Sequence, residues 1–185
     1  IAGFLRAVPI TPSSVEWNKD DDEGTTVLSD AATILRVLRA GLTEKKRKGK
    51  ITFKSTLEAP ARARKIITQL ARGQAVLRQS NSIGLEDVPI VCKTIFDTAE
   101  VSYPERTQIF YKLLENNGNI TLQQLANELG STVEFVLETV EQLKFLGLVQ
   151  LYGNVVTFTG DYRLIALGLR PYLFREIIHP TEVEQ

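Results

Sequence analysis

The residues best suited to chemistry are basic ones concentrated between positions 27 and 79. This segment has thirteen Lys or Arg residues against three acidic residues, although the whole chain carries no net charge. Residues 44–50 form a basic run that we expect to be a solvated, mobile loop. Its bases are Lys45, Lys46, Arg47, Lys48 and Lys50. Such a run can neutralise phosphates of a nucleic-acid backbone, and the alternative is a solubilising turn.

A second basic group is predicted on a helix over residues 55–79. Arg62, Lys65 and Arg72 recur at helical spacing and would line one side of that helix. The same pattern predicts a separate apolar face, made of Ala63, Ile66, Ile67, Leu70, Gln74 and Leu77. The three bases are therefore candidate phosphate contacts.

Groups suited to catalysis are scarce. His179 is the only histidine and Cys92 the only cysteine, and neither has a partner residue suggested by spacing. We find no Gly-rich phosphate loop, metal-ligand cluster or nucleophile–base pair. The acidic run at 20–23 is interpreted as a solvated loop, because no histidine or second carboxylate cluster lies near it. We expect no enzyme activity, no catalytic residue, no cofactor and no metal.

Residues 102–160 have the pattern of a winged helix-turn-helix. Three predicted helix starts have capping-box spacing, in which a hydroxyl residue precedes Glu or Gln by three positions. The pairs are Ser102 with Glu105, Thr121 with Gln124, and Ser131 with Glu134. Two β-prone runs, 148–152 and 155–159, are then joined by the hairpin dipeptide 153–154. Three helices followed by a hairpin predict the winged-helix fold, with Val133, Val136, Leu137, Val140 and Leu143 forming the core stripe of the third helix.

The surface that such a fold would present to DNA is poor in cations. A helix-turn-helix places the exposed N-terminal residues of its second helix in the major groove, which makes Ser131, Thr132 and Phe135 candidate contacts. Glu134 and Glu138 would also face phosphates there. From position 104 to 160, six acidic residues oppose three basic ones. If DNA is bound, we expect the basic segment to carry much of the affinity, with weak sequence selectivity.

The whole chain is predicted to be mainly α. We expect an extended linker over 1–27, a helical lid-like bundle over 28–100, a winged helix-turn-helix with a small β-hairpin wing over 101–160, and a helical tail over 161–185. In the bundle, Ser29 or Asp30 is expected to cap the first helix, and a later helix covers 85–99. In the tail, Pro171 is expected to interrupt the helix that begins at 161.

Residues 58–151 resemble the C-terminal end of AAA+ ATPases related to minichromosome-maintenance helicases, in which a small helical lid precedes a winged helix. The similar stretches are 60–75, 83–89 and 143–149, and residues 15–17 with the helix after them resemble the linker ahead of the lid. The resemblance implies that Arg62 takes the position of the second sensor arginine, which contacts nucleotide phosphate in the family. It also implies an ATPase domain elsewhere in the same polypeptide. The absence of Met at position 1 fits a chain that begins inside a longer product.

Two functions remain open from the sequence. The favoured one is a DNA-binding C-terminal module of a replication- or plasmid-type AAA+ ATPase or of a regulator. The alternative is a protein-interaction or scaffold module that uses the winged helix as a platform. A single cysteine and the lack of a secretory signal predict a cytoplasmic protein, and no apolar run reaches the roughly 18 residues of a membrane span.

Overall fold

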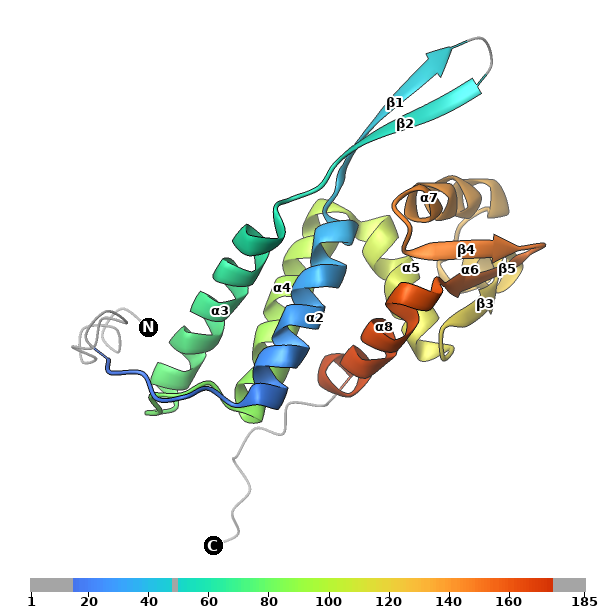
Figure 1. Ribbon diagram of the computed structural model, residues 1–185. Coiled ribbons are helices and arrows are strands. Elements are labelled where there is room, and N and C mark those ends of the chain that lie inside the picture. Colours follow the sequence, from blue (N-terminus) through green and yellow to red (C-terminus); the bar gives the residue numbers. More distant parts are fainter. Residues whose placement is uncertain (1–14, 48–49, 175–185) are drawn as a thin grey trace, which may run out of the picture.

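The computed structural model describes residues 15–47 and 50–174, without the side chains of residues 44–52. Within this part the chain is mainly α, with seven α-helices and two small antiparallel sheets (Figure 1). Three helices, α2, α3 and α4, lie side by side, and a two-stranded ribbon projects from one end of them. The mainly α prediction is therefore confirmed.

Helix α2 (Asp22–Leu38) begins earlier than the sequence indicated. The predicted extended linker is therefore wrong for residues 22–27, and the predicted cap at Ser29 or Asp30 is wrong. Asp21 is the N-cap instead, and its carboxylate accepts a hydrogen bond of 3.2 Å from the backbone N–H of Glu23. Acidic residues are favourable in a first helical turn because they face the positive end of the helix dipole. The acidic run is therefore a helix start rather than a loop.

The expected basic loop is also wrong, because the chain forms an antiparallel pair there. Strand β1 (Gly41–Arg47) pairs with strand β2 (Lys50–Thr56), and together we call them the ribbon. Lys48, one of the bases of the predicted loop, lies outside the described residues. Threonine and isoleucine in β2 favour the extended backbone.

Helix α3 (Pro60–Leu77) is found where a helix was predicted, but its buried side contains only two members of the predicted apolar face, Ala63 and Ile67. Ala63, Ile67, Ala71 and Ala75 are buried. Ile66, Leu70 and Leu77, which were expected in the core, are 40%, 41% and 57% exposed. Alanine side chains are short, so a stripe of them lets α3 approach α2 and α4 closely.

A short 3-10 helix η2 (Leu85–Asp87) and helix α4 (Val88–Ser102) follow, and helix α5 (Pro104–Glu115) comes next. The capping box predicted at Ser102 and Glu105 is not formed. Ser102 is still helical, and its hydroxyl donates to the backbone carbonyl of Thr98 at 3.1 Å. Pro104 occupies the first position of α5, where the missing N–H costs nothing.

The segment after α5 contains strand β3 (Asn119–Thr121), helix α6 (Leu122–Glu128), helix α7 (Val133–Phe145), strand β4 (Val149–Tyr152) and strand β5 (Val155–Phe158). The predicted hairpin at β4 and β5 is confirmed, with Gly153 at a positive φ of 61° in its turn. The sequence did not indicate β3, which makes a three-stranded sheet of order β3-β5-β4.

The two remaining helix caps differ in outcome. The capping box of Thr121 and Gln124 is confirmed, with both reciprocal hydrogen bonds at 3.2 Å. The box of Ser131 and Glu134 is wrong, because Thr132 is the N-cap of α7 and accepts from the N–H of Phe135 at 3.3 Å. Ser131 and Thr132 are adjacent and either hydroxyl could cap the helix, so the backbone path of the preceding turn decided which of them is the N-cap.

Helix α8 (Gly160–Leu173) continues through Pro171, so the predicted interruption there is wrong. The helix packs beside α2 and α4, Ala166 and Leu169 are fully buried, and this packing supports the helical path. The buried side chains form one cluster from α2 to α8, in which Phe96 stacks on Phe110 at 5.4 Å and Phe158 meets Phe110 edge-on at 5.8 Å. The position of any domain boundary remains a prediction. None of the helices in the described part is long and apolar enough to cross a membrane.

Candidate nucleic-acid interface

The pairing of β1 with β2 sorts the basic residues of the ribbon onto two faces. In an antiparallel pair, directly opposed residues share a face, and so do residues two apart along one strand. The register pairs Thr43 with Lys54, Lys45 with Thr52, and Arg47 with Lys50. These six residues and the pair Gly41 with Thr56 therefore form one face, which we call the cationic face: four basic residues, three threonines and a glycine, with no acidic residue.

The opposite face of the ribbon is different in chemistry. Its register pairs are Leu42 with Ser55, Glu44 with Phe53, and Lys46 with Ile51. One base is balanced there by one acid, and the other positions are mostly apolar. Lys46, which the sequence grouped with its basic neighbours, is thus separated from them by the pleat of the strand. Lys54 joins the candidate site, although the sequence did not single it out.

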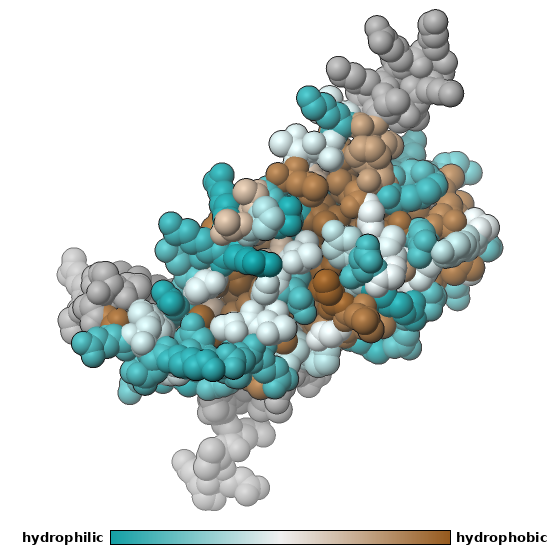
Figure 2. All heavy atoms as spheres, in the orientation of Figure 1, coloured by the Kyte–Doolittle hydropathy of each residue, from teal (hydrophilic) through white to brown (hydrophobic). Residues whose placement is uncertain are grey.

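An aromatic contact joins the described part of the ribbon to the rest of the molecule. The ring of Phe53 lies 5.5 Å from that of Phe145 at the end of α7. Figure 2 shows hydrophobic residues gathered where the ribbon leaves the helical body. Beyond this point the ribbon projects away from the helices (Figure 1). A two-stranded hairpin alone is marginally stable in water, so a surface that covers the ribbon would stabilise it.

The base of the ribbon is fixed by a buried arginine. Arg106 of α5 is 6% exposed and donates from Nη1 to the carbonyl of Ala40 at 2.6 Å, just before β1. Its Nε donates to Oε1 of Gln142 on α7 at 3.0 Å, and its guanidinium lies 4.8 Å above the ring of Tyr103. Burial lowers the pKa of Arg106, although an arginine stays charged in a protein. This one side chain ties the ribbon base to α5 and α7.

Additional bases lie where the ribbon joins the helices. Arg39, the C-cap of α2, is exposed, as is Lys65 of α3. Arg62 is also exposed in the first turn of α3, where its Nε forms an ion pair of 3.4 Å with Glu58. Because Arg62 itself is exposed, this pairing contributes little and leaves Arg62 able to exchange partners. Arg62 and Lys65 therefore extend the basic surface from the ribbon onto α3.

Arg72, in contrast, is separate from this surface. It lies near the other end of α3, and its guanidinium carbon sits 5.0 Å from the centre of the Trp17 ring. Such a cation–π contact anchors the segment before α2 against α3. The predicted stripe of Arg62, Lys65 and Arg72 is therefore divided, and Arg72 serves internal packing.

The predicted reading residues at the start of α7 are accessible but lie among acids. Thr132 and Phe135 are exposed, Phe135 by 47%, and Ser131 is half-buried. Glu134 and Glu138 are exposed beside them. Lys144 is at the far end of α7, where its Nζ lies 2.9 Å from Glu141. The structure does not bring these three candidates to the cationic face, because the ribbon meets the opposite end of α7.

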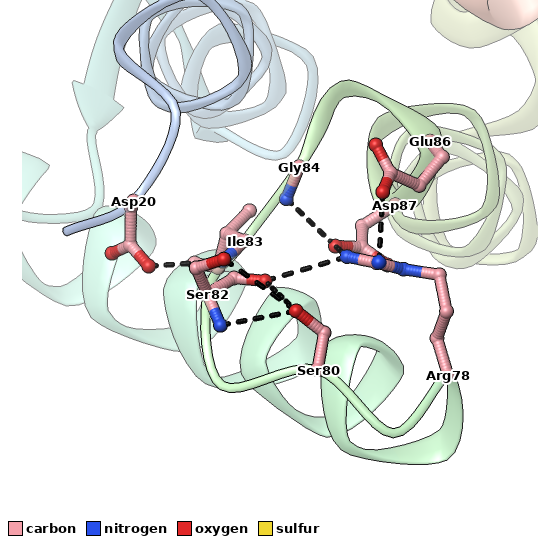
Figure 3. Close-up of polar contacts among 8 residues, drawn as sticks. All are labelled: Asp20, Arg78, Ser80, Ser82, Ile83, Gly84, Glu86 and Asp87. Carbon is pink, nitrogen blue, oxygen red and sulfur yellow. Dashed lines mark hydrogen bonds and ion pairs between the residues drawn. The ribbon is translucent and has the colours of Figure 1, made fainter. Parts of the chain in front are cut away.

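A polar network closes the end of the bundle opposite to the ribbon (Figure 3). Asp87 is fully buried and accepts from both Nε and Nη2 of Arg78, at 3.2 and 2.9 Å, and from the N–H of Gly84 at 2.9 Å. Arg78 also pairs with Glu86 at 2.8 Å, and Asp20 accepts from the N–H of Ile83 at 2.9 Å. The groups of this network satisfy one another, so the cluster holds the loop between α3 and η2 in place.

A surface groove of about 500 Å³ lies between α4, α5, the end of α6 and the end of α8. Asp97, Glu100, Glu115 and Glu128 line it together with Lys93 and Lys112. Lys112 is paired with Glu115 at 2.7 Å, and this hydrogen bond raises its pKa. The acidic surplus makes the groove a poor site for phosphate. Among the described residues, no group of His, Cys, Asp or Glu is arranged to hold a metal ion.

Comparison with known proteins does not add to this picture. No protein-family model matches the chain, and neither curated proteins nor solved structures give a significant match.

Proposed function

We propose that the protein is a non-catalytic nucleic-acid-binding module in which the ribbon supplies the electrostatic affinity. The observation that carries the proposal is the cationic face, with Lys45, Arg47, Lys50 and Lys54 on one side of a projecting ribbon. Every cation that meets a phosphate releases a condensed counterion, and this release favours binding. Arg39, Arg62 and Lys65, which lie where the ribbon joins the helices, would enlarge the contact with the phosphates.

The proposal assigns the segment from α5 to β5 to a winged helix. The order of its elements, three helices with β3 between the first two and a hairpin at the end, supports this assignment. In this module α7 does not read DNA, because its accessible start carries Glu134 and Glu138 and no cation. We expect Glu138→Gln to leave binding unchanged or to strengthen it slightly.

The wider context is also part of the proposal. A helical bundle followed by a winged helix is what the resemblance to AAA+ ATPases of the helicase type implies. In such a protein this chain would be the C-terminal module, and DNA and an ATPase domain of the same polypeptide would be its partners. A cytoplasmic location accords with the single, buried thiol of Cys92.

The ribbon register provides a matched test of the proposal. Lys45 and Lys46 are adjacent in sequence and identical in chemistry, but they lie on opposite faces. Binding of a labelled DNA duplex would be measured by fluorescence anisotropy at several salt concentrations for the parent, Lys45→Gln and Lys46→Gln. Loss of one phosphate contact should flatten the slope of log affinity against log salt by about 0.9 and weaken binding about tenfold at 0.1 M salt.

We expect this loss for Lys45→Gln and for Arg47→Gln, and less than about a twofold change for Lys46→Gln. Equal effects of Lys45→Gln and Lys46→Gln would show that general charge, rather than the cationic face, drives binding. A parent protein that retains no DNA even at low salt would refute the proposed function.

A second candidate function is a docking platform for another protein on α7. Phe135 is a large apolar side chain, 47% exposed, beside Glu134 and Glu138. An aromatic anchor among carboxylates suits a partner with a basic surface. The discriminating measurement is retention of DNA by the parent protein at low salt, where no retention favours the docking platform over the ribbon proposal. Phe135→Ala then locates the DNA contact: unchanged affinity agrees with the ribbon proposal, whereas abolished binding would make α7 the contact surface for DNA.

A further inference from the structure

We infer that the nucleic acid recognised by the ribbon is B-form duplex DNA, entered through its major groove. This inference rests on the proposed function and specifies its substrate. It uses three properties of the ribbon: its dimensions, the residue types on its cationic face, and the location of its aromatic residue.

The ribbon has the dimensions of a major-groove element. Each strand has seven residues, which corresponds to a length of about 24 Å at roughly 3.4 Å per residue. The major groove of B-DNA is about 12 Å wide and admits a two-stranded ribbon, whereas the minor groove, about 6 Å wide, is too narrow for one of normal shape. Because the ribbon projects beyond α7 and β4, it could enter a groove without the helical body following it (Figure 1).

A-form RNA does not fit the same geometry. Its major groove is deep and narrow, and its accessible minor groove is wide and shallow. A projecting ribbon with basic residues on one face would not enter either groove of the RNA duplex and would contact the phosphates only from outside. We therefore expect duplex RNA to be bound by fewer of the cations than duplex DNA of equal length.

Single-stranded nucleic acid is disfavoured by the position of the aromatic ring. Proteins that bind single strands stack the nucleobases on aromatic side chains beside a basic groove. The cationic face has basic residues and threonines but no aromatic residue. Phe53, the aromatic residue of the ribbon, is on the opposite face and contacts Phe145. A single strand would therefore gain electrostatic attraction without base stacking.

The threonines add a modest capacity to distinguish one nucleobase from another. Thr43 and Thr52 share the cationic face with the four basic residues. A threonine hydroxyl can donate to or accept from a base edge, and its methyl group can contact the C5-methyl of thymine. We expect only a weak preference among duplex sequences. Arginine is the residue that most often recognises guanine, and Arg47 is the single arginine on the cationic face.

The test compares nucleic acids of one sequence with the whole chain at one salt concentration. The probes are a B-form DNA duplex of 24 base pairs, either of its single strands and the corresponding RNA duplex. A second DNA duplex carries glucosylated 5-hydroxymethylcytosine, which fills the major groove, and a third is saturated with netropsin, which fills the minor groove. We expect the unmodified duplex to be bound at least about tenfold more tightly than the single strand or the RNA duplex. Glucosylation should cause a loss of similar size, and netropsin should cause less than about a twofold change.

The outcomes separate this inference from the proposed function. If Lys45→Gln weakens binding but the single strand or RNA duplex binds as tightly as duplex DNA, the ribbon is a phosphate contact and the major-groove inference is wrong. Competition by netropsin without an effect of glucosylation would also overturn it, in favour of the minor groove. Failure of every nucleic acid to bind would instead refute the proposed function itself.

Discussion

Arg106 offers the sharpest test of how the ribbon is held. We consider Arg106→Met, which keeps much of the side-chain stem and removes the guanidinium. The change deletes the hydrogen bonds to the carbonyl of Ala40 at 2.6 Å and to Oε1 of Gln142 at 3.0 Å. It also deletes the stacking of the guanidinium on Tyr103.

The expected cost follows from burial. A hydrogen bond to a charged group contributes about 1.5–3 kcal/mol, and a buried acceptor left without a donor costs about 1–3 kcal/mol. These effects overlap, so we expect the free energy of unfolding to fall by about 2–4 kcal/mol. Lys112→Met on the same helix is the control. Its ammonium forms partly exposed ion pairs with Glu115 and Glu128, so its loss should cost about 1 kcal/mol or less.

The assay is urea denaturation followed by circular dichroism and by the fluorescence of Trp17, the only tryptophan. Trp17 lies against α3, so its signal reports on the helical bundle, whereas circular dichroism reports on all helices. Gln142→Ala, alone and combined with Arg106→Met, completes a double-mutant cycle whose coupling should be about 0.5–3 kcal/mol. A cost of Arg106→Met below about 1 kcal/mol, equal to that of Lys112→Met, would refute the reasoning that this arginine fixes the ribbon base.

Three further predictions concern the helices. In thermal or urea unfolding, Thr132→Ala should cost about 1 kcal/mol and Ser131→Ala much less, because Thr132 caps α7; the reverse order would restore Ser131 as the cap. Leu143→Ala should cost about 2–5 kcal/mol because Leu143 is fully buried, and Leu137→Ala should cost less because Leu137 is only partly buried; equal losses would contradict the helix orientation. Burial raises the pKa of the Cys92 thiol from its usual 9.0 to about 12, so the unfolded chain ionises first as the pH rises. Stability should therefore fall between pH 9 and pH 12 by up to about 4 kcal/mol, and Cys92→Ala should remove this part of the pH dependence of urea unfolding.

Local chemistry made parts of the fold predictable. Thr121 and Gln124 form a capping box from neighbours three residues apart, and the hairpin of β4 and β5 has its turn at a glycine with positive φ. Both features depend on interactions within a few residues, which the sequence displays directly. The cap of α7 was missed because Ser131 and Thr132 are both good caps and the path of the chain selected between them.

The face that a helix buries was less predictable. The predicted apolar face of helix α3 ran from Ala63 and Ile67 to Ile66, Leu70 and Leu77, but the buried side is turned toward Ala71 and Ala75 and leaves Ile66, Leu70 and Leu77 outside. The structure buries the alanine stripe, because close approach to α2 and α4 depends on the size of side chains on three helices at once. Similarly, Pro171 is helical because packing of α8 against α2 outweighs the hydrogen bond that proline lacks.

The sequence by itself determined that the chain is mainly helical, that its bases are concentrated before position 80 and that the segment after it is acidic. Only the tertiary structure decided which bases could act together. The extended strand places Lys45 and Lys46 on opposite faces, and the strand register decides which basic residues of the partner strand share each face. Arg72 packs on the ring of Trp17, which is more than fifty positions away in the sequence. Charge is a property of each residue and can be counted along a chain, whereas a charged face depends on register and on contacts between segments distant in sequence.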